Sequence, residues 1–272
     1  MWNRFTCVPR SLEKHILKLK ANKTPPIIDY IREFYHPSNV SEIKEKMFLY
    51  PNNYFAIKLS TLGIRYNEGL CFELVDSIIQ TAIDNKCKVF IDAEEHDIQE
   101  PIDIMSDHFL ERYNGIETNV YKTHQMYKKG SLERLKNDLN KSRDYTLGIK
   151  LVRGAYLRKD RDKGVLCNTE NETHIQYNQA ISDFANYCDP RDKMICATHN
   201  VRSVFIARHF MDERQIDNIA FAQLMGMSDH LTNYLQHSGY TVYKYLPYGN
   251  LYESIPYLTR RLFENSQMLK YI

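Results

Sequence analysis

Eight short runs rich in β-branched and aromatic residues recur along the chain, separated by longer stretches with helical spacing. We expect strands at 26–31, 54–60, 88–92, 116–122, 145–152, 193–198, 219–224 and 241–246. Between them, apolar side chains recur three or four residues apart, as at Leu70, Leu74 and Ile78. Strands joined by helical crossovers pair in parallel. Eight of them in 272 residues favour a closed (β/α)₈ barrel over an open sheet.

The intervening segments predict one domain over 1–272, because no linker rich in Pro, Gly or Ser interrupts the alternation. We expect a first helix at 11–20, helix N-caps at Ser131 and Ser228, and a helix end at Gly239. The polar stretch 158–173 is typical of a long mobile loop. Neither a G-x-G-x-x-G nor a P-loop motif occurs, which weighs against those nucleotide sites.

Charge and cysteine usage exclude several classes of protein. The formal net charge is only +2, which gives no basic face for nucleic acid. The six cysteines form no C-x-x-C pair, so we expect reduced, mostly buried thiols and an intracellular protein that is not secreted. No apolar run is long enough for a transmembrane segment. The basic N-terminus is explained either by the first helix or by a targeting segment.

Most of the predicted strands end in a residue that can bind or react. In a (β/α)₈ barrel the carboxyl ends of the strands meet on one face, where the site is built. Any one such residue is explained by bonds to its neighbours, but together they predict a polar site. These residues are Lys58, Asp92, Gln125, Lys150, Arg153, His199, Gln223 and Tyr245.

The sequence SIPYLTRRLFENSQML predicts a C-terminal amphipathic helix. Pro256 is tolerated only in the first turn of a helix, so we expect the helix to start near Ser254 or Ile255. An apolar face of Ile255, Leu258 and Leu262 would pack, and the opposite face would meet water or a ligand. That face holds Tyr257, Arg260, Arg261 and Glu264. Two adjacent arginines can grip a small carboxylate, although a solvated face with an Arg260–Glu264 pair explains the pattern as well.

Eight stretches taken together resemble the proline dehydrogenase family over nearly the whole chain. They are IKLS (57–60), IDAEE (91–95), VYKTHQMY (120–127), IKLVRGAYL (149–157), ATHN (197–200), FAQLMGM (221–227), YLPYG (245–249) and YLTRRLFEN (257–265). Their order and spacing, and above all YLPYG followed by the double arginine, make the resemblance specific. The KLVRGAYL motif is more similar to that of eukaryotic-type members than to that of the bacterial bifunctional ones. No aldehyde dehydrogenase domain follows, so a monofunctional form is expected.

The resemblance implies a distorted (β/α)₈ barrel with a C-terminal helix covering its carboxyl face and FAD bound noncovalently there. It implies oxidation of L-proline to Δ1-pyrroline-5-carboxylate, the first step of proline catabolism, by hydride transfer to flavin N5. The protein would hold the donor carbon of proline against the flavin. No residue is required as a base, and water can take the amine proton. The electron acceptor would be a quinone or the respiratory chain, with transient membrane contact and a cytoplasmic or mitochondrial location.

The same resemblance assigns roles to individual residues. Lys58, Asp92 and Lys150 would serve catalysis, with an Asp92–Lys58 pair orienting the lysine. The proline-binding residues would be Arg260, Arg261, Tyr257, Tyr245, Leu224 and Lys58. The FAD contacts would be Ala93, Gln125, Lys150, Arg153, Gly154, Ala155, Thr198, His199, Asn200 and Glu264, and the gate would be Glu33. Bacterial members have arginine at the position of Lys150. The lysine keeps the positive charge but lacks the planar, forked guanidinium group of arginine.

Three alternatives stay open. A hydroxyproline dehydrogenase on the same scaffold is disfavoured by Tyr245, because in the family a smaller residue there admits a ring hydroxyl. A Schiff-base lyase would use Lys58 or Lys150 as its nucleophile. An inactive relative would keep only the barrel fold. The intact Arg260–Arg261 pair disfavours this alternative. Metal catalysis is not expected, since the histidines show no H-x-x-x-H spacing.

Overall fold

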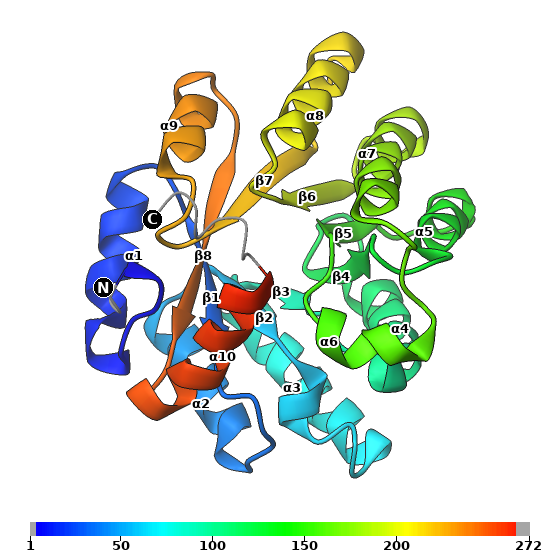
Figure 1. The fold of residues 1–272 in the computed structure, drawn as a ribbon. Helices are drawn as coiled ribbons and strands as arrows, with labels where there is room; N and C mark the ends of the chain where they lie inside the picture. Colours follow the sequence, from blue (N-terminus) through cyan, green and yellow to red (C-terminus); the bar gives the residue numbers. More distant parts are fainter. Residues whose placement is uncertain (1–3, 265–272) are drawn as a thin grey trace.

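The computed structural model describes residues 4–264, without the side chains of Leu251 and of residues 260–264. Within this range, eight parallel strands pair in chain order and close into a barrel when β1 pairs with β8 (Figure 1). The strands are β1 Pro26–Tyr30, β2 Tyr54–Ile57, β3 Lys88–Ile91, β4 Val120–Gln125, β5 Gly148–Val152, β6 Lys193–Ala197, β7 Ile219–Leu224 and β8 Val242–Tyr248. The predicted fold class is confirmed.

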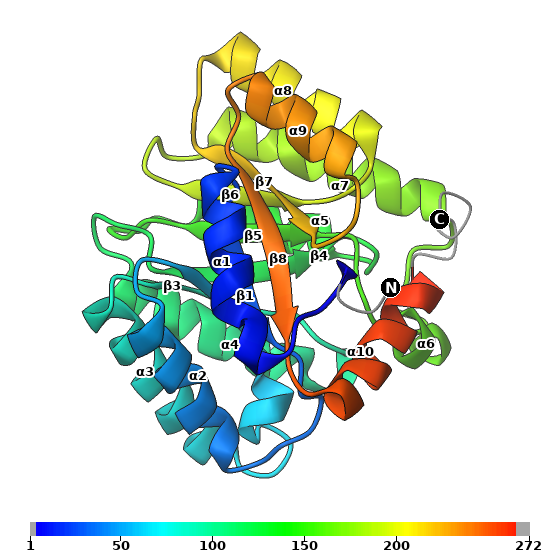
Figure 2. The ribbon, with the colours of Figure 1, turned by 90° about the vertical axis from the view of Figure 1, so that its left-hand side faces the viewer.

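The helices are α1 Leu12–Ala21, α2 Ser38–Leu49, α3 Glu68–Asp84, α4 His96–Tyr113, α5 Ser131–Asn140, α6 Leu157–Asp160, α7 Glu170–Tyr187, α8 Val201–Arg214, α9 Asp229–His237 and α10 Leu251–Glu264. They pack around the barrel, except for α6 and α10, which lie at its carboxyl end (Figure 2). Three short 3₁₀ helices are described as well: η2 Pro9–Ser11, η3 Leu59–Leu62 and η4 Arg161–Lys163. Figure 2 shows α10 and α6 at the end of the barrel to which the strands point, so α10 reaches the predicted carboxyl face.

The apolar core has an inner and an outer part because side chains alternate along each strand. Outward residues such as Ile28 and Leu151 pack under the helices in two large clusters. Inward residues fill the barrel with an aromatic layer made by Tyr54, Phe90 and Tyr243, in which the hydroxyls of Tyr54 and Tyr243 are 2.9 Å apart. This layer is the floor under the polar mouth of the barrel.

Several predicted segments differ in detail. The second strand ends at Ile57 rather than at residue 60, because η3 follows it at Leu59, and the fifth strand begins at Gly148 rather than at residue 145. The fourth strand begins at Val120, four residues later than expected, because the Asn114 carboxamide accepts the backbone N–H groups of Asn119 and Val120 and ties this segment into a loop. The stretch 158–173 is not one long loop, since α6 and η4 interrupt it. The buried Asp160 carboxylate anchors α6 by accepting the Tyr127 hydroxyl at 2.6 Å.

The helix caps follow the sequence only in part. Gly239 adopts the left-handed conformation after α9, as predicted. Ser131 is instead the first residue of α5, and the cap before it is Gly130 with φ of 76°. Ser228 is the N-cap of α9, but its side chain makes no capping bond. Four of the six cysteines are buried, as expected. No helix among residues 4–264 combines the length and apolar character needed to cross a bilayer.

An ion cluster outside the barrel ties β4 to the helices and gives a first testable prediction. Lys122 contacts Asp107 and lies 2.9 Å from Asp138, and His124 Nε2 is also 2.9 Å from Asp138. Burial opposes ionisation of Asp138, but the hydrogen bond and charge of His124, together with Lys122, outweigh it and lower the pKa of Asp138 to about 2. This ionised carboxylate therefore stabilises the fold above its unfolded pKa near 3.9, and the gain is lost as pH falls toward 2.

Replacing Asp138 by asparagine is expected to lower the free energy of unfolding by about 2 kcal/mol at pH 7. Urea unfolding of both proteins between pH 7 and pH 3.5 measures the difference. The difference in the free energy of unfolding should stay constant down to about pH 4.5 and become smaller below about pH 4. A difference that does not change with pH would show that the charge of Asp138 is not what stabilises the fold.

Candidate active site at the carboxyl end of the barrel

A row of polar side chains stands directly above the aromatic floor of the barrel. In β1, Ile27 faces inward and Ile28 outward, so Asp29 faces inward again. The same alternation turns Lys58 and Asp92, which directly follow β2 and β3, inward. It does the same for Lys150 in the middle of β5 and Tyr245 in the middle of β8. The resulting group, called here the mouth cluster, consists of Asp29, Lys58, Asp92, Lys150 and Tyr245, each 0–9% exposed.

Within the mouth cluster, Asp92 binds both Lys150 and Tyr245. Lys150 Nζ contacts Asp92 Oδ1 and donates to the Tyr245 hydroxyl at 3.1 Å. The Tyr245 hydroxyl donates to the two Asp92 carboxylate oxygens at 3.0 and 3.1 Å. Lys58 Nζ contacts Asp29 Oδ1 and is 3.8 Å from Asp92. The predicted Asp92–Lys58 pair is therefore the longer contact of Lys58, whose closer carboxylate is Asp29.

Electrostatics keep Asp92 charged despite its burial. Burial opposes ionisation of Asp92, but the adjacent ammonium groups of Lys150 and Lys58, with the Tyr245 hydroxyl, hold the pKa of Asp92 below its ordinary value. Burial and the negative charges of Asp92 and Asp29 raise the pKa of Tyr245 well above its ordinary value. Asp92 is therefore a carboxylate and Tyr245 a neutral hydrogen-bond donor at neutral pH.

The residues predicted to contact a flavin line the neighbouring strand ends and loops. Gln125 is buried at the end of β4, where its Nε2 donates to the Glu94 carbonyl at 2.8 Å. Its Oε1 accepts no hydrogen bond from the described part of the chain. A buried carboxamide oxygen without a donor is costly. Gln125 is thus a natural acceptor for a ligand that presents an N–H group.

Arg153 follows β5 and connects to the start of α8. Its guanidinium donates to Thr198 Oγ1 at 2.7 Å, Ser203 Oγ at 2.9 Å and His174 Nδ1 at 3.0 Å. Asn200 is the N-cap of α8, and its side chain accepts the Ser203 N–H at 3.0 Å. The positive end of the helix dipole and a cation therefore meet at one point, which suits an anionic group of a ligand.

Other predicted cofactor contacts lie at the same end of the barrel. His199 Nε2 accepts the Leu224 N–H at 3.0 Å, so Nδ1 is the ring nitrogen left to carry a proton. Ala93 and Ala155 are half-buried in the loops that follow β3 and β5. Gly154 has φ of 142°, and a Cβ there would lie 2.3 Å from the Tyr127 ring. The packing of Tyr127 is thus a reason for this glycine that the sequence did not show.

The helix over the mouth differs from its prediction. α10 starts at Leu251, so Pro256 lies inside it rather than in its first turn. The carbonyl that Pro256 cannot bond belongs to Tyr252, whose side chain is 85% exposed and whose surroundings admit water. Ile255 is 47% exposed and does not pack, whereas Tyr257 and Leu258 are buried. Tyr257 therefore faces the barrel.

The double arginine lies further along this helix. The backbone of Arg260, Arg261 and Glu264 is helical, and their side chains lie outside the described residues. Leu224 is half-buried, faces inward from β7 and is paired in register with Tyr245. Gln223, in contrast, points outward and contacts Thr232 of α9, so its predicted place at the mouth is wrong.

A small cavity of about 70 Å³ is lined by Lys58 and by the predicted gate residue Glu33. Most of the other residues that line this cavity were not predicted from the sequence as site residues. Glu95 pairs with both Arg65 and Lys159 across the opening, and Glu94 accepts the Ser60 N–H at 2.8 Å. The position of Glu94 and Glu95 two and three residues after Asp92 was a usable signal, since they share its loop. Lys159 was hidden by the prediction of a mobile loop.

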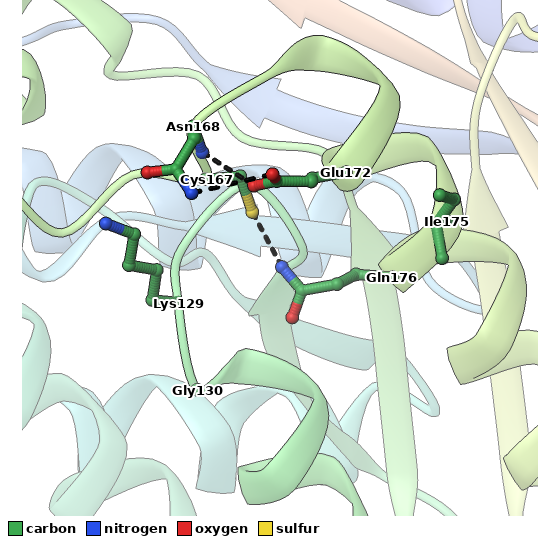
Figure 3. Close-up of a pocket in the computed structure, with 7 residues that line it drawn as sticks. All are labelled: Lys129, Gly130, Cys167, Asn168, Glu172, Ile175 and Gln176. Atoms are coloured by element: carbon green, nitrogen blue, oxygen red, sulfur yellow. Dashed lines mark hydrogen bonds between the residues drawn. The ribbon is translucent and has the colours of Figure 1, made fainter.

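A larger cavity of about 410 Å³ lies away from the mouth cluster, between the start of α5 and α7 (Figure 3). Its polar side chains already bond one another: the Gln176 amide contacts Cys167 Sγ at 2.7 Å, and Glu172 accepts the Asn168 N–H at 2.7 Å. None of its lining residues is a predicted site residue. Among residues 4–264, no group of three or more His, Cys, Asp and Glu side chains is placed to hold a metal ion.

Solved structures similar to this chain are proline utilization A (PutA) proteins. The protein from Bdellovibrio bacteriovorus, described as inactivated by N-propargylglycine, superposes with a TM-score of 0.86 at 16% identity, covering 97% of this chain and 32% of its own. The protein from Corynebacterium freiburgense superposes with a TM-score of 0.82 at 19% identity, covering 99% of this chain and 31% of its own. At such low identity the likeness shows the fold.

Similar sequences carry two names. The mitochondrial proline dehydrogenase 1 of Caenorhabditis elegans is 32% identical over 71% of this chain and 34% of its own length, and that of Dictyostelium discoideum is 29% identical over 97% and 50%. A hydroxyproline dehydrogenase of Xenopus laevis is 34% identical over 71% and 45%. The chain thus spans between a third and half of the length of these relatives. The sequence profile described as proline dehydrogenase matches residues 15–272, and the chain belongs to the proline dehydrogenase family.

Proposed function

We propose that this chain, as one barrel domain over 1–272, binds FAD and oxidises L-proline to Δ1-pyrroline-5-carboxylate. The observation that carries the proposal is the mouth cluster: a buried, charged and hydrogen-bonded group at the carboxyl end of a barrel that belongs to the proline dehydrogenase family. Relatives named proline dehydrogenase support the same substrate. Such a site suits a small zwitterion better than a large apolar ligand.

The residues present fit FAD. The unpartnered Gln125 Oε1 can accept an N–H of the flavin ring, and the start of α8 with Arg153 can hold the pyrophosphate. When bound, FAD supplies the acceptor for the hydride that leaves proline. The residues proposed to hold it are Ala93, Gln125, Lys150, Arg153, Gly154, Ala155, Thr198, His199, Asn200 and Glu264.

The mouth cluster and α10 would bind and orient proline. Tyr245, Tyr257 and Leu224 would pack against the pyrrolidine ring, and Arg260 with Arg261 would bind the carboxylate. Lys150 would place a cation beside the flavin, where Asp92 fixes its ammonium. Closely fitting walls hold the ring carbon at one distance from its hydride acceptor, which is how so small a substrate is positioned.

We assign no side chain as the base for the proline amine. Lys58 and Lys150 both engage carboxylates, so neither amine is free to accept a proton or to attack a carbonyl. Water is the proposed acceptor of the amine proton, and the same ion pairs disfavour a Schiff-base lyase. We further propose a quinone or the respiratory chain as electron acceptor, with transient membrane contact, in an intracellular protein. The mitochondrial names of two relatives support this location.

A dye-linked assay tests the proposal. Purified protein supplied with FAD should reduce an artificial electron acceptor only when L-proline is added. The product should give the coloured adduct that o-aminobenzaldehyde forms with the cyclic imine. Dye reduction without the adduct would show that L-proline is oxidised to a product other than the cyclic imine. Neither signal, in a protein that folds, would leave only the barrel.

We expect Tyr245 to set the preference between proline and hydroxyproline. Some similar relatives are named proline dehydrogenase and others hydroxyproline dehydrogenase. Its hydroxyl is held by Asp92 and Lys150, so the ring is fixed against the substrate pocket. Tyr245→Ser opens space there and should shift the ratio of kcat/KM values toward hydroxyproline by about 1–3 kcal/mol. Steady-state kinetics with both substrates measure the ratio, and an unaltered ratio would remove Tyr245 from the pocket.

A further inference from the structure

One buried acid of the mouth cluster has no role in the function proposed above. Asp29 lies near the end of β1, fully buried, with its side chain directed into the barrel. Its backbone neighbours in register are Ala56 of β2 and Pro247 of β8, neither of which carries a charge. A carboxylate in such a place is costly unless a cation compensates it. Lys58 supplies such a cation, because its ammonium contacts Asp29 Oδ1.

Lys58 lies between two acids. Its Nζ is 3.8 Å from Asp92 Oδ2, at the outer limit of an ion pair, and closer to Asp29. Asp92 already binds Lys150 and Tyr245. The lysine stem is flexible and its ammonium seeks the nearest negative charge. Without Asp29, Lys58 would move toward Asp92 and compete with Lys150 for it.

The charges of the cluster lead to the same conclusion. Within the mouth cluster, acids and lysines alternate in the order Asp29, Lys58, Asp92 and Lys150, so each lysine lies next to a carboxylate. In a buried site an uncompensated charge acts strongly on its neighbours. Loss of the Asp29 charge would act first on Lys58, whose ammonium contacts Asp29 and which lines the small cavity together with Glu33.

We propose that Asp29 is a positioning residue of the active site, which holds the Lys58 ammonium at the edge of the cavity and leaves Asp92 to Lys150 and Tyr245. Asp29 acts through Lys58 and does not itself touch the substrate. The inference rests on the proposed function, because it concerns the site at which proline would be oxidised. It gives Asp29 a role at that site, through its contact with Lys58.

A double-mutant cycle between Asp29→Asn and Lys58→Met tests the proposal. Asp29→Asn keeps the size of the side chain and removes its charge. With flavin content and melting temperature measured alongside, it should lower kcat/KM for L-proline about tenfold in the wild-type background. In the Lys58→Met background the same change should cost less than about twofold, because the group it positions is gone.

The cycle has two further arms. Asp29→Glu keeps the charge and should retain more activity than Asp29→Asn, and if the asparagine variant does not fold, the glutamate variant is carried through the same cycle. Its smaller loss should then vanish in the Lys58→Met background. Asp138→Asn is the matched control, since it also removes a carboxylate partner of a buried lysine, Lys122, but outside the barrel. It should lower stability and leave kcat/KM per bound flavin unchanged.

Equal losses of kcat/KM in both backgrounds would overturn the proposal and make Asp29 a structural residue only. A wild-type protein without proline activity would contradict the proposed function instead. The positioning role is then decided by NMR of protein labelled at the lysine ε-carbons, where the Lys58 signal is identified by its loss in Lys58→Met. That signal should move in Asp29→Asn and not in Asp138→Asn. A Lys58 signal unmoved by Asp29→Asn would overturn the role of Asp29 without reference to activity.

Discussion

Replacement of Asp92 by asparagine is expected to lower kcat/KM for L-proline by about 10²–10³-fold. The asparagine keeps the size of the side chain and can still accept the Tyr245 hydroxyl, but it removes the charge that fixes Lys150. Lys150 then loses its carboxylate partner in a buried site, and Lys58 loses its longer contact with Asp92. Steady-state kinetics per bound flavin measure the loss.

Stability should fall in the same variant, by about 3 kcal/mol, because breaking a buried ion pair leaves an uncompensated charge. The control is Asp107→Asn, which removes a partner of Lys122 behind β4 and should keep full activity. An Asp92→Asn protein that retains activity within threefold of the wild type would show that the mouth cluster is structural. Loss of activity through loss of bound FAD is recognised from the absorbance of the purified variant.

Arg261→Met is expected to raise KM for L-proline by about two orders of magnitude while bound flavin is retained. The reason is the loss of charge-assisted hydrogen bonds to the carboxylate of the substrate. The resemblance places Arg261 in the carboxylate clamp, and the structure places its backbone in α10, where Tyr257 one turn earlier faces the barrel. Kinetics over a wide proline range separate KM from kcat.

The matched control is Arg191→Met, an arginine in the loop before β6, at the opposite end of the barrel, where it pairs with Asp189. It should leave both KM and kcat unchanged. An unchanged KM in Arg261→Met would contradict the clamp. A variant that loses both flavin and fold would say nothing of the clamp, and Arg261→Lys, which keeps the charge but not the fork, would then take its place with a smaller rise in KM.

The fold could be predicted well because a parallel barrel buries both faces of its strands. Each strand therefore appears in the sequence as a short apolar run, and all eight runs became strands in the expected order. The errors arose where hydrogen bonds between distant residues decide the local structure. Asn114 delays the start of β4, and the Tyr127–Asp160 bond anchors α6 in a stretch whose polar sequence is typical of a loop.

The site was harder to predict than the fold. The strand-end pattern and the family resemblance identified Lys58, Asp92, Lys150 and Tyr245, but the pairing between them depends on which strands are neighbours and which side chains lie in one layer. That is why Lys58 was paired with Asp92 when Asp29 is closer. The start of α10 was misplaced for a related reason, since the position of a proline within a helix depends on whether water can reach the carbonyl it leaves free.

The measurement that tests the central claim most directly is the visible spectrum of the purified protein, before and after L-proline is added without oxygen. The proposed function predicts the absorbance bands of oxidised flavin, which bleach with L-proline and not with D-proline. That result would establish cofactor, substrate and reaction together. A colourless protein that takes up no added FAD, or a flavin that L-proline does not bleach, would contradict it.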